Sequence, residues 1–126
     1  MTAVEAIRTD RAPAAVGPYS QGTRKSGFVF TSGQLPMESG ELIVDDIERA
    51  ARCALSNVKA VLEAGGAALS DVVKVTIYLA DMDDFAAVNA AYAQTFREPF
   101  PARSCVEVGR LPLGAPIEIE AVAFVG

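Results

Sequence analysis

The chain has 126 residues, of which 51% are hydrophobic and 21% are charged. A chain of this length usually builds one core, so we expect a single domain that spans residues 1–126. Eleven basic and sixteen acidic residues give a net charge of −5. This balance argues against nucleic acid and against an anionic membrane as partners, because both are bound through clustered Lys and Arg.

The sequence contains no histidine and only two cysteines, Cys53 and Cys105. These counts exclude a Ser-His-Asp triad, a Cys-His pair, an HExxH zinc site and a thiolate metal cluster. The first ten residues have neither the basic nor the apolar region of a signal peptide, and no apolar run is long enough to span a bilayer. We therefore expect a cytoplasmic protein with free thiols.

The first third of the chain predicts two strands. One begins at residues 20–23, and the β-branched and aromatic run at 28–32 predicts the next. Gly33 and Pro36 end this second strand, and residues 38–41 are typical of a turn.

A long amphipathic helix follows. Asp45 and Glu48 resemble a capping box in which Asp replaces the usual Ser or Thr. Gly65 and Gly66 end the helix, since glycine adopts the left-handed C-cap without strain. Its apolar stripe is spaced by threes and fours and consists of Ile47, Ala51, Ala54, Leu55, Val58, Val61 and Leu62.

The second half predicts a strand at residues 72–79, a second helix with the stripe Phe85, Val88, Tyr92 and Phe96, and two closing strands at 103–111 and 116–125. Asp81, Asp83 and Asp84 suit the start of that helix. The element order predicts an α/β (α+β) fold in which two helices cover one face of a mixed sheet. The other face meets solvent or another subunit, and its mixed composition favours burial in an oligomer.

Candidate catalytic groups lie on the closing strands. Strand periodicity places Arg103, Cys105 and Glu107 on one face, and it places Glu118 and Glu120 together on the face away from the core. If these two strands pair as a hairpin, Arg103 lies near one of the two glutamates. The residues alone favour a surface salt bridge of little energetic value. The alternative is an anion-binding arginine beside a carboxylate that performs general acid–base catalysis.

Other polar positions also permit two interpretations. Tyr19 is a turn residue or a ligand contact. Ser32 and Gly33 form an ordinary turn or present backbone N–H groups to a ligand. Asn89, near the buried stripe of the second helix, hydrogen-bonds to neighbouring backbone or lines a pocket. Cys105 is an inert packing thiol unless Arg103 lowers its pKa.

Taken together, these positions resemble the RidA family of reactive-intermediate imine deaminases, also called YjgF. The similarity runs from about Arg11 to the C-terminus, and the segment PARSCVEV is the most specific part. The segments that carry the resemblance are GPYSQ at 17–21, TSGQLP at 31–36, NVKA at 57–60, VNAAY at 88–92, PARSCVEV at 101–108 and IEIEA at 117–121.

The resemblance implies a chorismate-mutase-like fold assembled as a homotrimer, with the sheets facing inward and active sites between subunits. It implies hydrolysis of 2-iminobutanoate, 2-iminopropanoate and the tautomeric 2-aminoacrylate to 2-oxo acids and ammonia. Such imines are released by pyridoxal-phosphate enzymes. Neither a cofactor nor a metal is implied.

The resemblance also implies roles for individual residues. Arg103 would bind the substrate carboxylate, and Glu118 would activate water and return a proton to the departing nitrogen, with Glu120 as its competitor for that role. Cys105 would not act as a nucleophile. The positions implied for substrate binding are Tyr19, Ser32, Gly33, Asn89 and Cys105.

Two other functions compete with the deaminase. A trimer of the same fold could bind small molecules or act as a holdase-type chaperone without turnover. The presence of both Arg103 and Glu118 favours the enzyme. Ribonuclease activity with translation inhibition is the third hypothesis, and the acidic balance and the lack of histidine argue against it.

Overall fold

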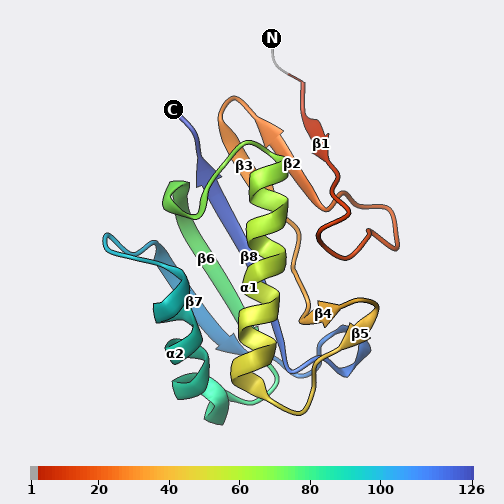
Figure 1. Ribbon diagram of the computed structural model, residues 1–126, viewed down its shortest axis with the longest axis vertical. Coiled ribbons are helices and arrows are strands. Elements are labelled where there is room, and N and C mark those ends of the chain that lie inside the picture. Colours follow the sequence, from red (N-terminus) through yellow and green to blue (C-terminus); the bar gives the residue numbers. More distant parts are fainter. Residues whose placement is uncertain (1–2) are drawn as a thin grey trace.

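The computed structural model describes residues 3–126 as a six-stranded sheet with two helices on one face (Figure 1). The strand order is β1-β2-β3-β8-β6-β7, and a separate two-stranded sheet is formed by β4 and β5. The helices are α1 (Ile47–Ala64) and α2 (Phe85–Thr95). The strands are β1 (Glu5–Ile7), β2 (Gly22–Lys25), β3 (Phe28–Thr31), β4 (Met37–Glu38), β5 (Glu41–Leu42), β6 (Val72–Leu79), β7 (Ala102–Glu107) and β8 (Ile117–Phe124). This confirms the predicted fold class.

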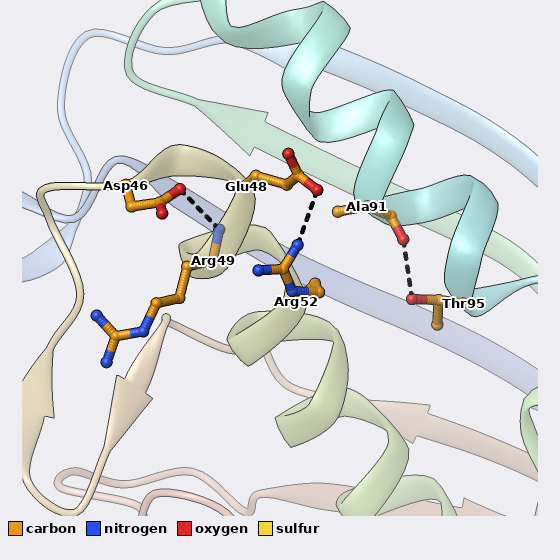
Figure 2. A network of polar contacts seen from close by, with 6 residues as sticks. All are labelled: Asp46, Glu48, Arg49, Arg52, Ala91 and Thr95. Atoms are coloured by element: carbon orange, nitrogen blue, oxygen red, sulfur yellow. Dashed lines mark hydrogen bonds and ion pairs between the residues drawn. The ribbon is translucent and has the colours of Figure 1, made fainter.

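The N-terminus of α1 is capped by Asp46, and the prediction of Asp45 as the cap is wrong by one residue. Asp46 has extended backbone angles (φ −147°, ψ 104°), and its Oδ1 accepts a hydrogen bond of 3.1 Å from the backbone N–H of Arg49. Glu48 does not complete a capping box. Its carboxylate instead pairs with Arg52 one turn later, at 2.8 Å (Figure 2).

The C-terminus of α1 closes at the predicted glycines. The backbone N–H of Gly66 donates to the carbonyl of Glu63, and that of Ala67 donates to the carbonyl of Leu62. This is a Schellman motif, in which the residue after the cap is left-handed. Gly66 fills that position with φ +87°, so glycine is required there for a conformational reason.

The second helix connects two parallel strands. β6, α2 and β7 form a strand–helix–strand unit, and β7 pairs with β6 in parallel at the edge of the sheet. β8 pairs antiparallel with β6 on its other side and with β3. The hairpin considered for the last two strands is therefore wrong, because β6 lies between β7 and β8.

The two faces of the sheet differ in what covers them. On one face, Val75 and Ile77 of β6 and Ile119 of β8 are fully buried. This face packs against α1, and α1 packs against α2 (Figure 1). On the open face, Phe28, Phe30 and Phe124 remain 42–45% exposed and contact one another.

Several boundaries differ from prediction. β1 was not predicted. Ile7 is its one buried residue, so this short strand has no alternation of apolar and polar residues that would indicate it. The predicted turn at 38–41 is the tip of the β4–β5 hairpin, with Ser39 and Gly40 at positive φ. β7 ends at Glu107 rather than at 111, and a 3₁₀ turn at Pro112–Gly114 precedes β8. Within residues 3–126, no helix has the length and apolar character that crossing a membrane requires.

The capping assignment predicts a stability difference between two adjacent aspartates. Asp46→Ala removes the acceptor of the Arg49 N–H and should lower the free energy of unfolding by about 1 kcal/mol. Asp45→Ala, the matched control, should change it by less than about 0.5 kcal/mol, as is usual for a surface substitution. Urea unfolding of both variants measures this. Equal effects, or a larger effect at Asp45, would contradict the assignment.

Candidate active site

The guanidinium of Arg103 is held against α2. Its Nη1 donates a 2.7 Å hydrogen bond to Oδ1 of Asn89, and its central carbon lies 4.8 Å from the ring centre of Tyr92 and 5.5 Å from that of Phe85. Arg103 is half-buried and lies opposite the fully buried Val75 in the β6–β7 register. Its side chain therefore lies on the helix-covered side of the sheet.

Among the residues that the structure describes, no carboxylate forms an ion pair with Arg103. The ion pairs found within residues 3–126 join Arg11 to Glu63 and Arg52 to Glu48. Glu107, which shares the strand face of Arg103, instead accepts a hydrogen bond from the backbone N–H of Met82 at 2.8 Å. A half-buried guanidinium with one neutral hydrogen-bond partner is suited to bind an anionic ligand through its other N–H groups.

A second group of candidates surrounds Glu118 on the open face. Gln34, just beyond β3, exchanges two backbone hydrogen bonds with Ile119, of 2.7 and 3.0 Å. This bridge presses Gly33 against Glu118. A Cβ atom at Gly33 would lie 2.6 Å from Cδ of Glu118 and 2.9 Å from its Oε1, so a larger residue at this position would displace the carboxyl group.

The neighbouring carboxylate, that of Glu120, already forms a hydrogen bond within the protein. Oε1 of Glu120 accepts a hydrogen bond of 2.8 Å from the hydroxyl of Tyr78. Burial raises the pKa of Glu118 above its ordinary value, and the charge of Glu120 raises it further. Across residues 3–126, the Glu118 carboxyl accepts no hydrogen bond from another side chain. A carboxyl group of this kind with a raised pKa is better suited to exchange protons than one that is fixed by a hydrogen bond.

Arg103 and Glu118 lie on opposite faces of the sheet. Arg103 packs under α2, whereas Glu118 is on the open face opposite Tyr78 of β6. Because β6 separates their strands, the strands are about 10 Å apart, which is two strand spacings. Arg103 pairs with Val75 and Glu118 with Tyr78, so the two residues are also offset by three positions along the sheet. One chain therefore cannot bring both side chains to the same small ligand.

The remaining candidates divide between these two groups. Asn89 and Cys105 lie with Arg103, and Arg103 opposes the rise in the pKa of the Cys105 thiol that burial causes. Ser32 lies beside Gly33, and its hydroxyl donates to the carbonyl of Ser20 at 2.6 Å. Tyr19 directly precedes Ser20 and is 51% exposed, and the backbone N–H of Val16 donates to its hydroxyl oxygen at 3.4 Å.

The aromatic contacts of Arg103 were not predicted from the sequence. Phe85 and Tyr92 were assigned to the core stripe of the second helix, and Phe85 is in fact 37% exposed. The signal was present, because Phe85, Asn89 and Tyr92 are spaced to share one helix face and the helix joins two parallel strands. Among residues 3–126, no three His, Cys, Asp or Glu side chains are grouped closely enough to hold a metal ion.

Relatives match this chain over almost its full length. A family model described as Endoribonuclease L-PSP matches residues 9–125. A protein of Salmonella typhimurium named 2-iminobutanoate/2-iminopropanoate deaminase is 50% identical over 121 residues, which are 93% of this chain and 94% of that protein.

Solved structures of similar sequence also match this chain over almost its full length. The crystal structure of the Escherichia coli YjgF gene product has a TM-score of 0.92 at 47% identity, covering 97% of this chain and 99% of that chain. Escherichia coli TdcF, crystallised with bound serine, has a TM-score of 0.91 at 44% identity with the same coverage. The chain therefore belongs to the Endoribonuclease L-PSP family, which is the RidA (YjgF) family that its motifs resemble.

Proposed function

We propose that this protein hydrolyses 2-imino acids, such as 2-iminobutanoate and 2-iminopropanoate, to 2-oxo acids and ammonia. The observation that carries the proposal is the unpaired guanidinium of Arg103, held by neutral groups in a position to bind a carboxylate. The name of the Salmonella relative and the serine bound to TdcF support a small substrate with the α-carboxylate of an amino acid. Neither a cofactor nor a metal is proposed.

In this proposal Arg103 binds the substrate carboxylate and Glu118 handles the protons. Glu118 accepts a proton from water as the water oxygen bonds to the electrophilic imine carbon. The C=N electron pair moves to the nitrogen, and Glu118 passes the proton to this nitrogen, which gives a carbinolamine and restores the carboxylate. The carbinolamine then forms its C=O bond and expels ammonia, while Glu118 carries a proton from the hydroxyl to the nitrogen. One water is consumed for each 2-oxo acid and ammonia released.

The other candidates shape the pocket. Gly33 leaves room for the Glu118 carboxyl and offers its backbone to the substrate. Ser32 offers the oxygen lone pairs of its hydroxyl, whose proton is donated to Ser20, and Tyr19 offers its own hydroxyl. Asn89 and Cys105 line the pocket around Arg103, where the burial that raises the Cys105 pKa keeps the thiol protonated and so not nucleophilic.

We infer that the site forms between subunits of a homotrimer, where Arg103 of one chain meets Glu118 of the next. Two observations support this: the two side chains lie on opposite faces of one sheet, and exposed phenylalanines cover part of the open face. The sheets would face inward. Each subunit is proposed as one domain over residues 1–126 in the cytoplasm, with neither nucleic acid nor a membrane as a partner. Mixing chains that each lack one of the two groups tests the shared site.

The two alternatives make different predictions. A non-catalytic trimer that binds small molecules or unfolded chains needs a pocket but no base, and it would leave Glu118 without a role. A net charge of −5 and the lack of histidine argue against ribonuclease activity. No feature of the site favours either alternative over the deaminase.

Loss of the guanidinium should abolish most of the activity. The assay couples the protein to a threonine dehydratase in the presence of semicarbazide, which traps free imine, and compares 2-oxobutanoate with semicarbazone. We expect Arg103→Ala to lower kcat/KM by about tenfold to a hundredfold, the value of hydrogen bonds to a charged partner. Arg52→Ala, on the outer side of α1, should retain full activity.

If wild-type protein diverts no imine from the trap, and diverts none when bulkier imino acids are tested, the deaminase proposal is wrong and the binding-protein alternative remains. Equal diversion by wild type and Arg103→Ala would remove Arg103 from the mechanism.

The pH profile should respond to Glu120. Glu118 acts as a base when it is deprotonated, so activity falls as the pH drops through its raised pKa. Glu120→Gln removes a negative charge and keeps an oxygen that accepts from Tyr78. The pKa of Glu118 should fall, and the acid limb of the kcat/KM profile should move to lower pH. Glu48→Gln, on α1, serves as the control, and an acid limb at the same or a higher pH in Glu120→Gln would contradict this role.

A further inference from the structure

The side chains that hold Arg103 share one property, which is that all of them are neutral. Nη1 of Arg103 meets the amide oxygen of Asn89, and the guanidinium carbon lies within 6 Å of the Tyr92 and Phe85 ring centres. A carboxylate partner would also orient the guanidinium, but it would compete with an anionic substrate. Neutral contacts orient the group and leave its charge available.

We propose that Tyr92, assisted by Phe85, is a positioning residue that fixes the Arg103 guanidinium for the substrate carboxylate. This inference rests on the proposed function and adds to it a specific residue on α2. Aromatic rings attract a cation through the negative potential of their faces, and a planar guanidinium stacks on them in a way that an ammonium does not. The rings therefore also explain why arginine rather than lysine is suited to this position.

The ring of Tyr92 is itself held rigidly. Its side chain is on the buried face of α2, with 6% of the residue exposed, and its ring centre lies 4.8 Å from that of Phe96. A ring packed in this way keeps its orientation as the ligand enters and leaves. Phe85, which is 37% exposed and farther from the guanidinium, makes the weaker of the two contacts.

The hydroxyl of Tyr92 does not carry this role. It is buried, and among residues 3–126 it has no hydrogen-bond partner. A buried hydroxyl without a partner costs stability rather than adding to it. What Tyr92 contributes to the site is its ring face, so phenylalanine should replace it without loss of the positioning effect.

The test compares Tyr92→Leu, which removes the ring, with Tyr92→Phe, which keeps it. Two quantities are measured: kcat/KM by competition with semicarbazide, and the Kd of the product 2-oxobutanoate by calorimetry. We expect Tyr92→Leu to lower kcat/KM and raise the Kd by a similar factor of roughly three- to tenfold, as the loss of a partly buried cation–π contact predicts. Tyr92→Phe should stay within about twofold of wild type, and Phe85→Leu should show a smaller loss than Tyr92→Leu.

A double-mutant cycle separates positioning from a general structural effect. If Tyr92 acts through Arg103, Tyr92→Leu should have no further effect on the Kd in an Arg103→Ala background, whereas a collapsed pocket would weaken binding in both backgrounds. Phe85→Leu, at the exposed end of the contact, provides the same comparison if Tyr92→Leu does not fold.

The outcomes distinguish this inference from the proposed function. If wild type has no deaminase activity but binds 2-oxobutanoate, the proposed function fails and the Kd comparison still decides the role of Tyr92. Unchanged binding in Tyr92→Leu, an equal loss in Tyr92→Phe, additive losses in the cycle, or no binding of 2-oxobutanoate to wild type would each overturn the inference.

Discussion

The parallel pairing of β6 with β7 is the constraint on which the rest of the site depends. Because α2 crosses over between these strands, the side chain of Arg103 lies under the helix, where Asn89 and Tyr92 hold it. The same arrangement places β6 between Arg103 and Glu118 and leaves the glutamate on the open face. The topology thus keeps Arg103 and Glu118 apart within one chain, and the proposed site joins the arginine of one chain to the glutamate of another.

Each of these two groups is electrostatically incomplete alone. The half-buried guanidinium of Arg103 forms no ion pair with residues 3–126, and burial and the charge of Glu120 raise the pKa of the Glu118 carboxyl. A substrate that carries a carboxylate and a polar C=N bond would give the guanidinium an anionic partner and would give the Glu118 carboxyl a group with which to exchange protons. Reactive imines are already electrophilic, so holding the substrate, one water and one base in place accounts for the chemistry proposed here.

The sequence predicted local structure well and long-range pairing poorly. Apolar periodicity located α1, β6 and α2, because these elements bury one face each and the pattern repeats along them. The position of Arg103 was missed because the closing strands were considered as a hairpin, and nothing in the local sequence of β7 says that its neighbour is β6. Tyr92 is in the core as predicted, but its contact with Arg103 and that of Phe85 were missed for the same reason, because Arg103 lies on a strand that only the crossover brings close. The helix cap is Asp46 rather than the predicted Asp45, because two adjacent aspartates can each serve as a cap and the sequence pattern does not distinguish them.

The measurement that tests the shared site most directly mixes two impaired variants. Arg103→Ala and Glu118→Gln homotrimers should each keep at most about a tenth of wild-type activity, and a random one-to-one mixture should rise to about one quarter, because an intact arginine meets an intact glutamate from the next chain at about one site in four. The double variant mixed with Arg103→Ala provides the control and should show no such rise. If light scattering and mass spectrometry show mixed trimers whose activity does not rise, or if the chain is a monomer, the two groups do not act across an interface and the account is wrong.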